Sequence, residues 1–233
     1  KILALANFSH KINDLEVVLS ASLGSTIIDA SKDSYDSLFN KLDYSLKQAK
    51  KLSPFGYYFA DLDALKRYER TNKIRYLLIN VDKSNELKLA LQPQYINENT
   101  FHSSEALLRW HSQELGIISP AEFIPIAEES EAIIKIGDWV IDNVCKLLHQ
   151  VGQLGKSTCI AVNISAKQIV ASDFKEKLLA SVQKWQVLPQ HLIIELTETT
   201  LVSDIELVKE TMVELNQMGF RFSIDDFGTG YSS

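Results

Sequence analysis

Cysteine is scarce in this sequence. Cys145 and Cys159 are the only two cysteines among 233 residues, and they do not have the spacing of a metal-binding motif. Two thiols in a chain of this length do not make a disulfide framework, which excludes a small disulfide-stapled fold. We expect both to be buried free thiols in a reducing compartment, so the sequence predicts a cytoplasmic protein.

Long apolar runs are missing as well. No stretch approaches the roughly 20 apolar residues that span a bilayer. Residues 1–18 also lack a basic region followed by a long apolar stretch, which excludes a signal peptide at this position. This segment is therefore predicted to make no membrane contact, and an anchor elsewhere in a longer parent protein stays open.

The sequence has no basic stripe. Its formal net charge is -6, with acidic and basic residues interleaved, so we exclude a nucleic acid polymer as its partner. An acidic protein that binds a phosphate-bearing ligand must overcome its own field locally. A bound divalent cation or one well-placed arginine would do so.

The sequence does contain enough apolar residues for a globular core, because 45% of it is hydrophobic and 23% charged. Residues 16–28 predict a mostly buried strand in which Gly24 allows a close backbone approach. An apolar stripe at helical period predicts a helix from Ser34 that ends before Pro54. Residues 63–80 predict a second, strongly charged helix that connects to the next region.

From Glu86 onward, short apolar strands alternate with amphipathic helices. Two of these helices begin with a Ser-x-x-Glu capping box, Ser119 to Glu122 and Ser203 to Glu206, and the second is predicted to stop at Gly219. Strands that alternate with helices predict an α/β fold, either a doubly wound sheet or a barrel. The predicted strands are 87–96, 104–110, 159–165, 192–199 and 220–227.

The predicted strand 104–110 carries opposite charges on one face. The two-residue period of a strand places Glu105, Leu107 and Arg109 on the same side. A carboxylate and a guanidinium that face inward are costly without partners. Arg109 therefore either pairs with Glu105 or faces a ligand.

Polar groups also stand near the ends of the later strands. Asn163 and Glu195 interrupt apolar strands, and Asp225 and Asp226 follow the last one. Taken singly, these are a turn or capping amide, a solvated strand-end charge and a helix N-terminal pair. Together with Glu105 they form an oxygen-only ligand set that suits Mg²⁺ or Mn²⁺. Two such ions are the usual device for phosphodiester hydrolysis, and we expect these side chains to converge.

Six blocks carry a resemblance to a known family, and they occur in its order and approximate spacing: LALQPQY, SSEALLRWHS, GIISPAEFIPIAEES, AVNISAKQ, IELTETTL and IDDFGTGYSS. Over Glu86 to Ser233 the sequence resembles the EAL domain, which binds cyclic di-GMP and hydrolyses it when its metal site is complete. Glu105, Ala106 and Leu107 match the signature triplet.

The resemblance implies specific roles. Gln92 would contact a guanine of cyclic di-GMP, while Leu107 and Arg109 would line the ligand, with Arg109 facing phosphate. Family members are (β/α)₈-type, TIM-like barrels whose first strand runs antiparallel, and they often act as homodimers. The implied ligands of a two-metal site for Mg²⁺ or Mn²⁺ are Glu105, Asn163, Glu195, Asp225 as the bridging group and Asp226; Glu105, Asp225 and Asp226 are the catalytic candidates.

The front of the chain resembles the last strand and helix of a GGDEF domain, without that family's signature loop. We therefore predict three segments in a tandem GGDEF–EAL arrangement. Residues 1–62 would be an α+β remnant of the GGDEF-like domain, 63–85 a helical connector and 86–233 the first part of the EAL domain.

The resemblance is incomplete at its far end. A (β/α)₈ barrel typically needs about 250 residues, and only about five strands are predicted after Glu86. We expect the sequence to be a fragment that holds the first half of the barrel. The leading hypothesis is a metal-dependent phosphodiesterase that converts cyclic di-GMP to linear pGpG. The alternatives are a catalytically inactive cyclic di-GMP receptor and a purely structural barrel fragment.

Overall fold

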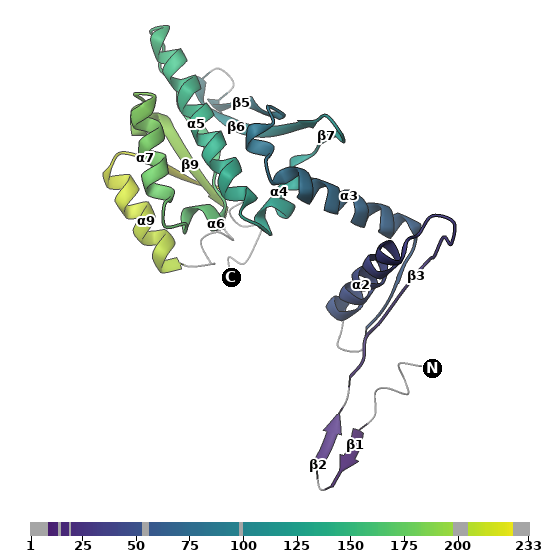
Figure 1. Ribbon diagram of the computed structural model, residues 1–233. Helices are drawn as coiled ribbons and strands as arrows, with labels where there is room; N and C mark the ends of the chain where they lie inside the picture. The colour runs from purple at the N-terminus through teal and green to yellow at the C-terminus, as the bar shows by residue number, and fades with distance from the viewer. Residues whose placement is uncertain are drawn as a thin grey trace. The chain divides into compact units, whose positions relative to one another are not determined.

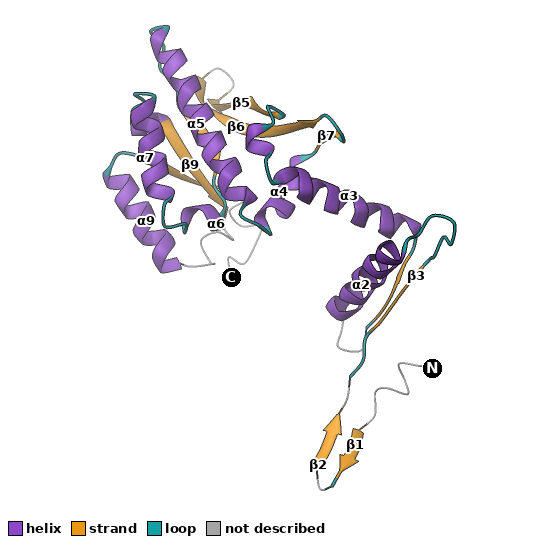
Figure 2. Cartoon of the chain, in the orientation of Figure 1, coloured by secondary structure: helices purple, strands orange, loops and turns teal. Residues whose placement is uncertain are grey.

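The chain forms two compact units, residues 1–73 and 74–233. The computed structural model describes residues 9–13, 15–18, 20–52, 56–97, 100–197 and 205–225, and Figures 1 and 2 show their helices and strands. Among the described helices, none is long and apolar enough to cross a membrane.

The described residues of the first unit form short strands, helix α2 and the first part of helix α3, which continues past the end of the unit at Lys73. Strand β3 pairs in parallel with β4, and helix α2, which lies between them in sequence, contacts both. The single buried strand predicted over 16–28 is wrong, because the segment forms two four-residue strands without fully buried positions where burial is described. The elements are β1 (Ser9–Ile12), β2 (Leu15–Val18), β3 (Leu23–Thr26), α2 (Tyr35–Leu52), β4 (Tyr57–Ala60) and α3 (Leu62–Leu78).

Gly24 lies directly against the backbone of α2, as its position in the sequence predicted. A Cβ atom placed on Gly24 would lie 2.3 Å from the backbone nitrogen of Leu46 and 2.6 Å from the carbonyl carbon of Ser45. Neither of these backbone atoms can move without displacing the helix. Only glycine therefore allows β3 and α2 to pack at this distance.

The described residues of the second unit form a six-stranded sheet, and all five predicted strands are confirmed. The strand order is β10-β9-β8-β6-β5, with β7 paired to β6. Strand β5 is antiparallel to β6, whereas β6, β8, β9 and β10 are parallel. The strands are β5 (Leu87–Asn97), β6 (Thr100–Ser112), β7 (Gly116–Ile118), β8 (Ile160–Asn163), β9 (Leu192–Thr197) and β10 (Arg221–Asp225).

The order of these strands favours a barrel over a doubly wound sheet. Apart from the short β7, each strand lies beside its neighbour in the sequence, and the order does not reverse as it does in a doubly wound sheet. Figure 1 shows α5, α7 and α9 gathered on one face of this sheet. The described strands form an open sheet, so closure into a barrel stays a prediction.

Two helix ends in the second unit lie where the sequence predicted them, the start of α4 and the stop of α9. Pro120 is the first residue of α4, but the Ser119 side chain makes no capping hydrogen bond. Ser203 lies outside the described residues. Gly219 stops α9 with a φ of 96°, as predicted. The helices are α4 (Pro120–Glu128), α5 (Ala132–Gln153), α6 (Ala166–Ile169), α7 (Phe174–Lys184) and α9 (Ile205–Gln217), with 3₁₀ turns η1 (Val81–Lys83) and η2 (Pro189–His191).

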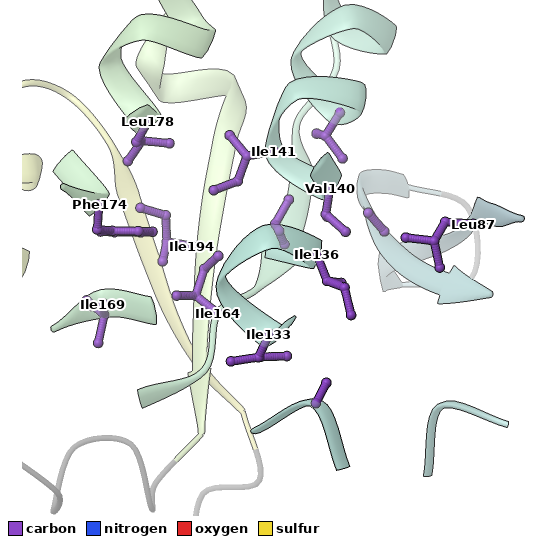
Figure 3. Packing of buried hydrophobic residues seen from close by; sticks show 14 of the residues in the cluster. Leu87, Ile133, Ile136, Val140, Ile141, Ile164, Ile169, Phe174, Leu178 and Ile194 are labelled. Carbon is purple, nitrogen blue, oxygen red and sulfur yellow. The ribbon is translucent and has the colours of Figure 1, made fainter. Parts of the chain in front are cut away.

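The core of the second unit lies between the sheet and the helices that cover one face of it. Helix α5 contributes a stripe at helical spacing, which includes Ile133, Ile136 and Val140. Figure 3 shows this stripe beside Ile164, which follows β8, and Ile194, which lies on β9. Cys145 is buried here as predicted, whereas Cys159 is only partly buried.

Strand β6 is held to this core by Trp110. The indole is fully buried, packs edge-on against Phe123 at 5.3 Å between ring centroids, and donates its Nε1–H to Glu86 at 2.8 Å. The second carboxylate oxygen of Glu86 accepts the backbone N–H of Gln113 at 3.0 Å. Because side chains alternate along a strand, Trp110 in the core directs Arg109 to the opposite face, as predicted.

The Gly24 contact can be tested by substitution. We expect Gly24→Ala to lower the free energy of unfolding by about 1–3 kcal/mol, because the new methyl group collides with backbone that cannot yield. Gly152→Ala is the matched control, since a Cβ at Gly152 meets nothing within 4 Å. It should leave stability unchanged or raise it by up to about 1 kcal/mol. Urea denaturation followed by circular dichroism measures both, and equal stability of the two variants would contradict the close approach.

Candidate functional site

The register of the parallel strands brings the predicted polar groups to one face of the sheet. Asn163 on β8 lies opposite Glu195 on β9, and Asp225 on β10 lies opposite Thr197, two residues further along β9. Glu105 on β6 lies opposite Ala161, two residues before Asn163. Residues two apart on a strand point to the same side. Four oxygen-bearing side chains from four strands therefore share the face opposite the core.

Glu105 and Asn163 are in direct contact. The side-chain amide of Asn163 donates a hydrogen bond to Oε1 of Glu105 at 2.7 Å. Asn163 is exposed at the end of its strand, so this bond is not enclosed by apolar neighbours. Gln92 lies opposite Glu105 in the antiparallel pair of β5 and β6, and its side chain is exposed.

Glu195 is the buried member of the group, with only 7% of its surface exposed. Burial is the main cause that raises its pKa above the ordinary value of a glutamate, and the negative charges of Glu105 and Asp225 raise it further. A hydrogen bond from Gln94 opposes the shift. The repulsion places the other two carboxylates within electrostatic reach of Glu195, as expected for side chains that share a site.

The donor set at this face is chemically suited to a hard divalent cation. Its carboxylate and amide oxygens are the ligands that Mg²⁺ and Mn²⁺ prefer, and a cation would relieve the repulsion around Glu195. In the part of the chain that the structure describes, however, no three His, Cys, Asp or Glu side chains are grouped as they stand to hold a metal ion. Asp226, the predicted ligand of a second ion, lies outside the described residues. The metal-binding roles stay a prediction.

Arg109 does not form an ion pair with Glu105, although both side chains belong to the described part of the chain. Its guanidinium instead donates to the backbone carbonyl of Leu108 at 2.8 Å. That bond leaves most of the five guanidinium N–H groups available to an anionic ligand.

A cavity of about 800 Å³ lies beside Asn163 and Arg109. Leu107, Arg109, Asn163 and Thr197 are among its lining residues, and its volume falls within the range of small-molecule sites. Its walls are mainly apolar and come from α4, α5 and the segment after β8; Ile133, Ile136 and Ile164, labelled in Figure 3, belong to them. Gln92 does not line it, and neither do the carboxylates Glu105, Glu195 and Asp225.

Sequence reasoning missed one polar neighbour of Glu195. The Gln94 side chain on β5 lowers the pKa of Glu195, and its amide oxygen accepts a hydrogen bond from the Ser103 hydroxyl at 2.5 Å. The two-residue period from Gln92 places Gln94 on the same face, so the signal was present in the sequence. The apolar walls of the cavity had no such signal, because they form only when α4 and α5 pack on the sheet.

The sequence profile of the EAL domain family matches residues 72–233. The chain belongs to the EAL domain family. The match begins within α3, ahead of Glu86, and it includes every candidate site residue.

Curated relatives of this EAL domain include two bacterial signalling proteins. The bifunctional diguanylate cyclase/cyclic di-GMP phosphodiesterase MucR of Pseudomonas aeruginosa is 31% identical over 96% of this chain and 33% of its own length. The cyclic di-GMP phosphodiesterase PdeR of Escherichia coli is 29% identical over 100% of this chain and 35% of its own length. The chain thus spans about a third of the length of these relatives.

Solved structures share the fold of this EAL domain. The PaMucR phosphodiesterase in complex with c-di-GMP superposes with a TM-score of 0.66 at 35% identity, over 69% of this chain and 66% of that one. The EAL enzyme Bd1971 in its cAMP- and cyclic-di-GMP-bound form superposes with a TM-score of 0.64 at 27% identity, over 87% and 54%.

The charge repulsion at Glu195 predicts how the metal-free protein depends on pH. Because the pKa of Glu195 in the folded protein is raised, its ionisation costs stability as the pH rises from the ordinary glutamate value through the raised one. We expect Glu195→Gln to remove this loss and to raise the thermal unfolding midpoint at pH 7 in the presence of a chelator. The same variant should bind Mn²⁺ more weakly than the wild type.

The control is Glu176→Gln, which removes a carboxylate from an exposed position on α7 and should change neither quantity. Calorimetry with chelator and titration with Mn²⁺ give the two readings. A Glu195→Gln variant that is less stable than the wild type without metal would show that the carboxylate is a favourable structural partner, contrary to the repulsion.

Proposed function

We propose that the protein is a metal-dependent phosphodiesterase that hydrolyses cyclic di-GMP to linear pGpG. The observation that supports this best is the set of three carboxylates and one amide on one sheet face, in which the amide residue, Asn163, lines a cavity together with Arg109. The named activities of MucR and PdeR, and the ligand in the PaMucR complex, support the same reaction.

In this proposal one group of residues binds metal ions and another group binds the ligand. Glu105, Asn163, Glu195 and Asp225, with Asp226 beyond the described residues, hold Mg²⁺ or Mn²⁺. The ions would supply the positive charge that phosphodiester hydrolysis requires in an acidic protein. Water adds across one phosphodiester bond, so the ring opens and the product keeps one terminal phosphate.

Arg109 and Leu107 seat the ligand. The guanidinium is held near the cavity by its bond to the Leu108 carbonyl, and its remaining donors face a phosphate through charge-assisted hydrogen bonds. Leu107 offers an apolar surface beside it, and Gln92 contacts a guanine. Cyclic di-GMP is the ligand we propose because it combines anionic phosphates with planar bases, and the cavity combines a cation with apolar walls.

The front of the chain fits the same assignment. We propose that residues 1–62 are the end of a GGDEF-like domain, 63–85 a connector and 86–233 the start of the EAL domain. The parallel pair of β3 and β4 joined through α2 is a β-α-β unit, and the match to MucR, which is named as a diguanylate cyclase as well, extends over nearly the whole chain.

The activity is tested on the intact protein. We expect linear pGpG to accumulate when cyclic di-GMP is incubated with protein and Mg²⁺ or Mn²⁺, and to be absent when a chelator is added. Asp225→Asn serves as the inactive control. Chromatography resolves substrate and product. A protein that binds cyclic di-GMP tightly but forms no pGpG with either ion would overturn the enzyme and establish the receptor.

The role of Arg109 is tested separately. We expect Arg109→Ala to weaken cyclic di-GMP binding about 10- to 150-fold, which corresponds to about 1.5–3 kcal/mol for lost charge-assisted hydrogen bonds. Thermal stability without ligand should change little, because the described structure shows no ion pair of Arg109 with Glu105. Arg221→Ala is the control, since Arg221 begins β10 at the opposite end of the parallel strands. Isothermal titration calorimetry gives both affinities, and equal weakening in the two variants would contradict the assignment.

A further inference from the structure

Gln168 is a buried polar residue to which the proposed function assigns no role. It lies on α6, the single helical turn that follows Asn163, and only 4% of its surface is exposed. A glutamine buried to this extent needs hydrogen-bond partners. Its partners reveal what it fixes in place.

The amide oxygen of Gln168 holds the backbone just after the end of β8. It accepts the backbone N–H of Ser165 at 3.1 Å and the Ser165 hydroxyl at 2.9 Å. Both donors belong to a residue two positions beyond Asn163. One side chain thus fixes the direction in which the chain leaves the strand.

The amide of Gln168 is in turn seated on α5. A Cβ atom placed on Gly137 would lie 1.6 Å from Nε2 of Gln168 and 2.6 Å from its Cδ, so no residue larger than glycine leaves room for the amide. Gly137 is buried inside a 22-residue helix. Glycine destabilises a helix interior relative to alanine, and a glycine there usually has a packing reason. The seat for Gln168 is that reason here.

Two further contacts hold the same segment. The ammonium group of Lys167 donates to the backbone carbonyl of Glu128 at the end of α4, at 2.8 Å. The backbone N–H of Ile164 donates to the carbonyl of Glu195 on β9, at 2.9 Å. The residues from Ile164 to Gln168 are therefore tied to α4, α5 and β9.

We propose that Gln168, seated on Gly137, is a positioning residue for Asn163. Asn163 is exposed at the last position of β8, so burial of its own side chain does not fix it. The ladder with β9 holds its backbone on one side, and the segment that begins at Ile164 holds it on the other. The inference rests on the proposed function, in which Asn163 is a metal ligand. Residues that orient metal ligands typically alter metal affinity about 10- to 100-fold when they are replaced.

The test replaces the amide and keeps its size. Gln168→Met fills the seat on Gly137 but cannot accept the two hydrogen bonds from Ser165. In the metal-free intact protein, hydrogen exchange should speed up in the segment from Ile164 to Gln168. Mn²⁺ affinity, measured by titration with electron paramagnetic resonance, should fall about 10-fold or more. The control is Gln183→Met, at an exposed position on α7, which should change neither reading.

A second variant tests the seat itself. Gly137→Ala should weaken Mn²⁺ binding through displacement of Gln168, and combined with Gln168→Ala it should add little to the loss that Gln168→Ala alone causes. Additive losses, or faster exchange in Gln168→Met at unchanged Mn²⁺ affinity, would overturn the positioning role while the phosphodiesterase assignment stands. A wild type that neither binds Mn²⁺ nor forms pGpG would overturn the proposed function, and with it the role of Gln168 at a metal site.

Discussion

Three carboxylates share one face of the sheet, and one of them, Glu195, is buried among the charges of the others. Like charges at short range in a poorly solvated place oppose folding, so the arrangement persists only because the apolar face of the same strands contributes more. Leu192, Ile194 and Leu196 on that other face of β9 are nearly or fully buried in the core. The site is thus held together by the side of the sheet that takes no part in its chemistry.

This division between the two faces explains how a functional site tolerates strain. The stripe of α5 packs against the apolar side chains of β8 and β9, which fixes the strands in register. The carboxylates on the other face are then brought together although they repel one another. Natural proteins commonly place such destabilising groups where a ligand later neutralises them.

The sequence was sufficient for the longer elements and insufficient for the short ones. Strands β8, β9 and β10 were found because parallel strands give short apolar runs between helical patterns, whereas β5 and β6 were found from the length of their apolar segments. Strands β4 and β7, of four and three residues, are too short to show a period. The range 16–28 looked like one strand because its apolar composition continues across the break between β2 and β3.

The sequence likewise predicted some residues of the candidate site and missed others. Residues that interrupt an apolar strand, such as Asn163 and Glu195, are visible in sequence because a polar side chain is unexpected there. Gln168 was not visible, since glutamine is ordinary in a helix and its meaning depends on Gly137, which lies far away in the sequence. Contacts of this kind arise from tertiary packing, and no local pattern encodes them.

The pairing of Asn163 with Glu195 also determines where residues can be inserted or deleted without disrupting the site. Side chains alternate along β9, so a single residue inserted or deleted within Leu192–Thr197 would turn Glu195 into the core and an aliphatic residue toward Asn163. The turn between α7 and η2 is not subject to this two-residue alternation of side chains, because it ends before β9 begins. We therefore expect insertions and deletions in this part of the molecule to be tolerated in the connections and not within the strands.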